Sequence, residues 1–74
     1  MRLSDLQLKM VINMSDGKHL GVIVDAEVNS EGTINYFVVV PKHFFKRFFK
    51  NEPELNITYK EIVKIGEDVI LVNV

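Results

Sequence analysis

Apolar and polar residues alternate along much of this chain, and turn-forming residues interrupt the alternation at short intervals. The clearest case is residues 20–29, where Leu20, Val22, Val24, Ala26 and Val28 fall on one predicted face. A period of two is typical of a β-strand with one buried face. Short strands separated by regularly spaced turns predict an all-β domain rather than helices that alternate with strands.

The pattern predicts six strands, at residues 9–14, 20–29, 34–40, 55–58, 62–65 and 69–72. Two short helical pieces are expected beside them. One is a capped turn at residues 3–6, in which Ser4 accepts a backbone N–H, and the other is a single helical turn at residues 59–61. So many short strands in a chain of this length predict a small six-stranded barrel, strongly bent, that forms one domain over residues 1–74.

Glycine and aspartate mark the turns between these strands. Asp16 and Gly17 suit a tight hairpin, and Gly32 is the expected left-handed residue of the next turn. Gly66 is expected to need a positive φ in the last turn, and Gly21 is a further structural glycine.

Strict alternation leaves several large apolar residues outside the predicted interior. If Val22 and Val24 face inward, Ile23 faces outward. The strand at 34–40 is apolar on both faces, so Tyr36 and Val38 inside leave Phe37 and Val39 outside. Such residues need cover from another segment or another chain.

Residues 42–50 break the alternation with a run that is aromatic and basic. At helical spacing its phenylalanines fall on one arc and its cations on the other, which predicts a short helical turn. Three roles are open: a cap over the barrel, a surface for self-association or a protein partner, and contact with an anionic membrane. The candidate interaction surface combines the outward strand residues with this run: Ile23, Phe37, Val39, Phe44, Phe45, Lys46, Arg47, Phe48 and Phe49.

Composition narrows the function classes. The 74 residues carry a net charge of −1, but residues 42–50 hold four cations and no acid, against five basic and ten acidic residues elsewhere. One basic segment on an acidic body disfavours general nucleic-acid binding. The absence of cysteine and of any long apolar run predicts a cytoplasmic protein without a signal peptide or membrane span.

No residue set predicts catalysis, a cofactor or a metal. Asp25 with Glu27 and Glu67 with Asp68 are the closest carboxylate pairs, and they fit a polar strand face and a turn better than a shaped cation site. His19 and His43 lack a ligand-spaced neighbour. We therefore expect a protein that binds and does not catalyse.

The segment Ser15-Asp16-Gly17-Lys18-His19-Leu20-Gly21-Val22-Ile23-Val24-Asp25 resembles the PRC-barrel motif of a turn, a glycine and a strand that ends in aspartate. The opening residues 2–6, the phenylalanine run and the closing residues 62–72 are similar to the YlmC/YmxH group of that superfamily, whose members are named as sporulation proteins. The resemblance covers nearly the whole chain. One departure is Thr58-Tyr59-Lys60, where the family often has proline before a hydrophobic residue.

This resemblance implies a bent six-stranded barrel that docks onto larger assemblies and has no shared catalytic residues. The expected function is a non-catalytic interaction or scaffold module, associated with sporulation, that self-associates as a homodimer and binds a protein partner the sequence does not name. The alternative is a ribosome- or RNA-linked accessory factor similar to RimM, and a membrane-surface adaptor ranks third.

Overall fold

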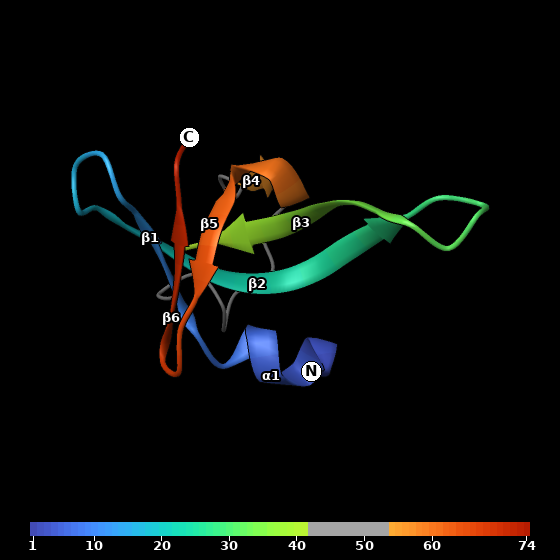
Figure 1. Cartoon of the computed structure of the whole chain (residues 1–74), viewed down its shortest axis with the longest axis horizontal. Coiled ribbons are helices and arrows are strands. Elements are labelled where there is room, and N and C mark those ends of the chain that lie inside the picture. Colours follow the sequence, from blue (N-terminus) through green and yellow to red (C-terminus); the bar gives the residue numbers. More distant parts are fainter. Residues whose placement is uncertain (42–53) are drawn as a thin grey trace.

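The computed structural model describes residues 1–41 and 54–74 and consists mainly of one strongly bent sheet (Figure 1). The sheet has six strands in the order β4-β3-β2-β1-β6-β5. The elements are α1 (Leu3–Gln7), β1 (Met10–Asn13), β2 (His19–Val28), β3 (Ile34–Val40), β4 (Leu55–Ile57), the 3₁₀ turn η2 (Tyr59–Glu61), β5 (Ile62–Ile65) and β6 (Val69–Val72). The predicted all-β class is confirmed, and the helical turn predicted within residues 42–50 lies outside the described residues.

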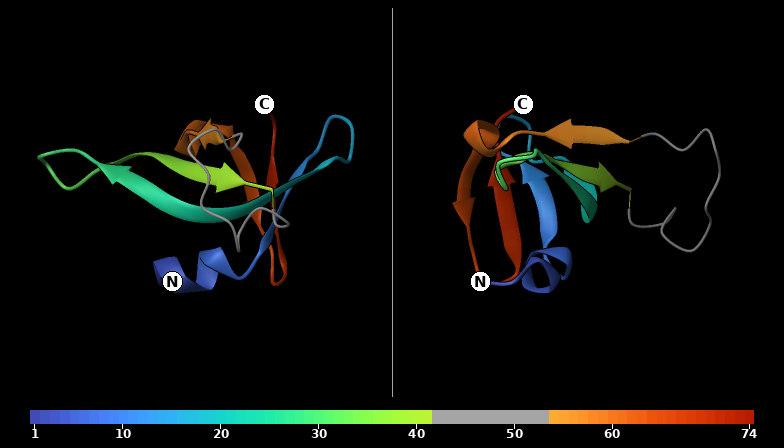
Figure 2. Two further views of the ribbon diagram at one scale, coloured as in Figure 1. Left: turned by 180° about the vertical axis from the view of Figure 1, so that it is seen from behind. Right: turned by 90° about the vertical axis from the view of Figure 1, so that its right-hand side faces the viewer.

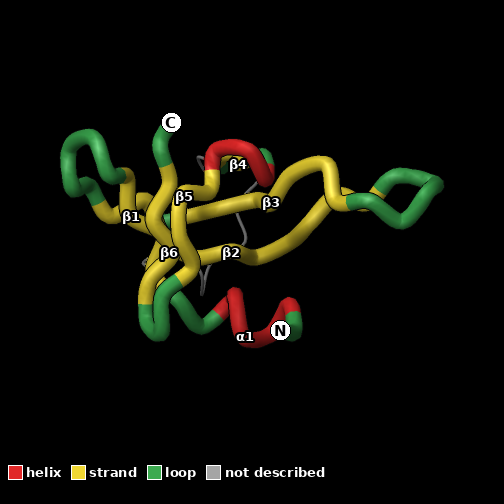
Figure 3. Tube along the Cα trace, viewed as in Figure 1, coloured by secondary structure: helices red, strands yellow, loops and turns green. Residues whose placement is uncertain are grey.

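Strand β2 is much the longest and belongs to both halves of the sheet (Figure 3). Its first residues pair with β1, and the rest of the strand pairs with β3, antiparallel in both cases. Beyond these, β4 pairs with β3 and β5 pairs with β6, again antiparallel, whereas β1 and β6 run parallel. One long strand shared by two partners lets the sheet fold over its own inner face.

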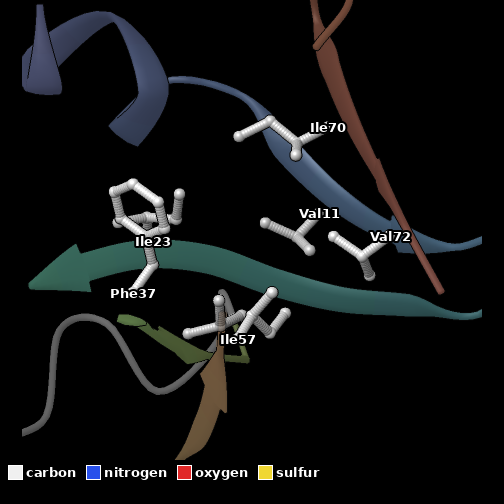
Figure 4. Close-up of a cluster of buried hydrophobic side chains, with 7 residues drawn as sticks. Val11, Ile23, Phe37, Ile57, Ile70 and Val72 are labelled. Carbon is white, nitrogen blue, oxygen red and sulfur yellow. The ribbon is translucent and has the colours of Figure 1, made fainter. Parts of the chain in front are cut away.

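The hydrophobic core lies on that inner face and draws on every strand (Figure 4). Ile62 and Ile65 of β5 pack against it from one edge of the sheet. The buried members of the cluster are Val11, Ile23, Phe37, Val39, Ile57, Ile70 and Val72.

The expectation that Ile23, Phe37 and Val39 face outward is wrong. Their side chains are 2%, 5% and 1% exposed and lie in the core. The cause is one bulge in each strand. In β2, Ile23 pairs with Val39 but the next pair is Asp25 with Val38, so Val24 has no partner of its own; in β3, Asn35 has none between the pairs Glu27–Tyr36 and Val28–Ile34. An extra residue of this kind shifts the alternation by one, and strict alternation therefore assigned the faces incorrectly.

Gly21 lies inside β2 rather than in a turn, and β3 passes very close to it. Its φ is +136°, a backbone conformation that residues with a side chain rarely adopt. A Cβ added there would overlap the carbonyl oxygen of Val40. This position therefore accepts only glycine without a shift of the backbone. This close approach fixes the end of β3 against the start of β2.

The other turn predictions have mixed outcomes. Gly17 and Gly32 have the expected positive φ values of 70° and 87°, and the Asp16 carboxylate accepts the backbone N–H of Lys18 at 2.9 Å. The prediction for Gly66 is wrong, because its φ is not positive. Its N–H instead donates to the carbonyl of Val69 at 2.8 Å, which closes the β5–β6 hairpin.

Helix α1 begins differently from the prediction. Ser4 lies within the helix, and the cap comes from Asp5, whose carboxylate accepts the backbone N–H of Arg2 at 2.9 Å. At η2 the Glu61 carboxylate plays the same part by accepting the N–H of Thr58 at 2.9 Å. Side chains three residues inside each turn therefore satisfy the first backbone donors.

We expect Gly21→Ala to lower the free energy of unfolding by about 3 kcal/mol or more, because the new Cβ overlaps the backbone of Val40. Gly32→Ala is the matched control. Its φ is also positive, but nothing lies within 4 Å of its Cβ position, so about 1 kcal/mol is expected. Urea unfolding of both variants tests the difference. Equal decreases in the free energy of unfolding would contradict the close approach of β3 to Gly21.

The bulge in β2 predicts unequal costs at adjacent positions. Ile23→Ala should lower the free energy of unfolding by about 3 kcal/mol, since it leaves a cavity in the core. Val22 is half-buried on the opposite face, and Val22→Ala should cost about 1 kcal/mol. Thermal and urea unfolding measure both free energies. A larger decrease for Val22→Ala would place Val22 in the core and contradict the bulge.

Candidate functional site

The β2–β3 hairpin projects from the body of the domain as an arm (Figure 1). We call residues 25–37 the hairpin arm. Its tip is held by Asn29, whose side-chain oxygen accepts the backbone N–H groups of Glu31 and Thr33 at 2.9 and 3.0 Å. The backbone N–H of Asn29 also donates to the carbonyl of Thr33 at 2.9 Å. These bonds give the tip a defined shape, so the arm presents a preformed surface.

One face of the arm continues the hydrophobic core outward. Ala26 pairs with Phe37 near the base, and Val28 pairs with Ile34 near the tip, after a second bulge has restored the apolar residues to the same face. Phe37 is 5% exposed, Ile34 is 38% exposed and Val28 is 54% exposed. Apolar surface thus runs without interruption from the core to solvent.

An open groove of about 420 Å³ lies against this face. Its other walls come from α1, η2 and β5. The right-hand view in Figure 2 shows how these three elements lie, with η2 at the top, β5 at the left and α1 at the bottom. The lining is almost entirely apolar and comprises Leu6, Gly32, Thr33, Ile34, Phe37, Tyr59, Ile62 and Ile65. We call this the apolar groove. Segments distant in sequence meet at this groove, because β3 and η2 lie in contact.

Tyr59 gives the groove its most accessible aromatic ring. It is the first residue of η2 and is 72% exposed. The turn that carries it is fixed at both ends, by the Glu61 carboxylate at Thr58 and by the backbone N–H of Asn73, which donates to the carbonyl of Glu61 at 2.9 Å. Tyrosine held on a rigid turn is a common anchor of protein interfaces.

The opposite face of the arm is acidic. Asp25 and Glu27 lie there, Glu31 lies at the tip, and residues 19–41 contain no lysine or arginine. Glu27 pairs across the strands with Tyr36, and the pKa of Tyr36 lies above its ordinary value of 10.0. The largest cause is a hydrogen bond from the Tyr36 hydroxyl to Glu27. Burial contributes next, followed by the negative charges of nearby carboxylates, Glu54 included. The carboxylates of Glu27, Glu54 and Asp25 therefore all act on the Tyr36 hydroxyl.

A second hollow, between α1 and the β5–β6 turn, is structural. Lys9 lies in its wall, and the Lys9 ammonium donates to the backbone carbonyls of Gly66, at 2.7 Å, and Glu67. The N–H of Met10 donates to the carbonyl of Asp68 at 3.1 Å beside it. These hydrogen bonds hold the start of β1 against the β5–β6 hairpin, and they use the Lys9 ammonium within the fold.

The sequence-predicted interaction surface is therefore divided. Ile23 and Val39 are inaccessible, and Phe37 forms part of the inner wall of the apolar groove. The remaining members, Phe44, Phe45, Lys46, Arg47, Phe48 and Phe49, lie outside the described residues. Sequence reasoning missed Ile34 and Tyr59, because their roles depend on the bulges and on a contact between distant segments.

Within residues 1–41 and 54–74, no group of three or more histidine, cysteine or acidic side chains is arranged to hold a metal ion. Asp25 and Glu27 are exposed on the arm, and Glu67 and Asp68 occupy the last turn. The helices of the described part are all too short to cross a membrane.

The family model for the PRC-barrel domain matches residues 1–74. The chain belongs to the PRC-barrel family. This PRC-barrel domain is 45% identical over 71 residues to the protein named "Probable sporulation protein YlmC" of Bacillus subtilis, covering 95% of this chain and 88% of the relative. It is also 33% identical over 63 residues to an uncharacterized protein of Clostridium acetobutylicum, covering 85% of this chain and 72% of the relative. The bent all-β fold and the family predicted from the sequence are both confirmed.

The acidic face of the arm makes a testable electrostatic prediction. Glu27→Gln should lower the pKa of Tyr36 toward 10.0, because it removes the strongest acceptor and one negative charge. Spectrophotometric titration in a Tyr59→Phe background, where Tyr36 is the single tyrosine, measures this shift. Glu31→Gln is the control and should leave the pKa unchanged. An equal pKa in Glu27→Gln would contradict the cross-strand contact.

Proposed function

We propose that this PRC-barrel domain is a non-catalytic protein-interaction module that acts in sporulation, in the cytoplasm, and binds its partner through the apolar groove. The sporulation context is supported by the name of the Bacillus subtilis relative and by the 45% identity to it. The observation that carries the binding role is an open groove of about 420 Å³ with an almost wholly apolar lining on the surface of so small a domain.

Apolar surface of this kind is costly to expose. Ile34 and Tyr59 are large, lie on rigid elements and remain accessible. Their burial by a partner would remove apolar area from water at about 25 cal/mol per Å². Within residues 1–41 and 54–74 the single core already draws on the strands, and it leaves Ile34 and Tyr59 uncovered. A partner protein supplies the missing cover.

The lining favours a protein partner over a small substrate. Sites for small molecules combine an apolar wall with a few convergent polar groups that fix the ligand. Among the described residues that line the groove, only Thr33 and Tyr59 have polar side chains, and the acidic groups of the arm lie on its other face. A contact spread over a larger surface can use both faces, because a protein partner extends past the groove.

An RNA-linked role has weaker support. The described residues include nine acidic and five basic side chains, and the arm has no cation at all. Phosphate contacts need clustered lysine or arginine, and the cluster of four cations at residues 42–50 lies outside the described residues. Self-association stays a prediction, now without the outward strand residues on which it was based.

Site-specific photo-crosslinking in sporulating cells tests the proposal. A benzophenone amino acid in place of Tyr59 should give a discrete crosslinked adduct, because this position lines the groove and is exposed. Met14 is the matched control position, since it is also exposed but lies in the β1–β2 turn, which projects on the side of the molecule away from the hairpin arm (Figure 1).

The expected result is an adduct at position 59 that is absent at position 14 and that disappears in an Ile34→Ser background. Thermal unfolding must show that the Ile34→Ser variant is folded. Equal crosslinking at both positions, or none at position 59, would contradict binding through the groove.

A further inference from the structure

The hairpin arm has two chemically different faces within one pair of strands. Ile34 and Val28 face the groove side and extend the core. Asp25 and Glu27 face the other way, and Glu31 adds a third carboxylate at the tip. A partner that fills the groove and extends past the arm meets this negative edge, where charges attract each other over a screening length of about 8 Å at physiological salt.

Resting on the proposed function, we infer that the partner segment presents an apolar side chain to the groove and has lysine or arginine beside it, which meets the acidic arm. The apolar residue enters between Ile34 and Tyr59. The basic residues reach over the arm toward Glu31 and Glu27. The arm itself contains no cation that would repel them.

The electrostatic half of this inference has independent geometric support. Glu27 and Asp25 are two residues apart on one strand face, and Tyr36 faces Glu27 across the strands. The charges of Glu27, Glu54 and Asp25 all raise the pKa of that tyrosine, so their fields overlap at one place on the arm. Overlapping carboxylates attract a cation more strongly than separate ones.

The mode of entry follows from strand β5, which forms an end of the described sheet and borders the groove. An extra strand could in principle pair with such an edge. However, β5 has a bulge at Val63, and a lysine, Lys64, follows it. Bulges and lysines are features that block edge-to-edge pairing. The partner is therefore held by side chains in the groove rather than by added backbone pairing.

Selection from a random-peptide library on the immobilised full chain tests this inference. Peptides are first depleted on an Ile34→Ser, Tyr59→Ser variant whose fold is checked by circular dichroism. The expected binders have an aromatic or branched apolar residue with lysine or arginine nearby. Backbone amide shifts of the protein should change at Ile34, Tyr59 and Ile62.

Charge variants then separate the two halves of the inference. The triple variant Asp25→Asn, Glu27→Gln, Glu31→Gln should weaken the selected peptide about three- to tenfold at low salt, and much less at high salt. Asp16→Asn is the control, because its remaining amide oxygen can still accept the N–H of Lys18 and because it lies in the β1–β2 turn, away from the hairpin arm (Figure 1). It should leave the affinity unchanged.

Three other outcomes would contradict this inference. Acidic or uncharged peptides that occupy the groove would overturn this inference and leave the proposed function standing. If no selected peptide depends on the groove, the inference fails, while crosslinking at position 59 still tests the function separately. If sedimentation shows a dimer that Tyr59→Ser dissociates and Met14→Ser does not, the occupant is a second copy, and the inference is also overturned.

Discussion

The close approach of the end of β3 to Gly21 of β2 is the constraint on which the rest of this structure depends. The carbonyl of Val40 occupies the place of a side chain at Gly21, so the two strands approach more closely than ordinary residues allow. Bulges lie on either side of this point, since Leu20 and Val24 each lack a partner in the adjacent pairing. Together they bend β2 so that one strand serves both halves of the sheet, and the inner face closes around a single core.

The same bend produces the hairpin arm. After the bulge at Val24, β2 and β3 continue as a pair beyond the region where the other strands can cover them. The apolar face that is core at Phe37 becomes groove at Ile34 and solvent-exposed at Val28. The groove is thus a direct consequence of how the core is built: it is the part of the inner face that residues 1–41 and 54–74 leave open.

Local features of the sequence predicted the elements well but not their faces. The strands at Ile34–Val40, Ile62–Ile65 and Val69–Val72 and the turn at Tyr59–Glu61 have the predicted bounds. For the strands, the reason is that turn-forming or charged residues flank segments that are mostly apolar. Bulges have no comparable signature, since an extra valine in a valine-rich strand looks like its neighbours. The error therefore inverted the faces at Ile23 and in β3. The groove was not predictable from periodicity, because its walls come from α1, the arm, η2 and β5.

These corrections change the functional argument as well as the fold. The surplus apolar surface expected at Ile23 and Val39 does not exist, so an interface built on those residues has no basis. The surplus lies instead at Ile34 and Tyr59, on elements whose backbones are fixed by Asn29 and Glu61. A rigid apolar groove beside a rigid acidic edge loses little conformational entropy when a partner binds. Specificity then comes from the pairing of the two features, since an apolar side chain alone fits many grooves, whereas one with a cation at the right distance fits few.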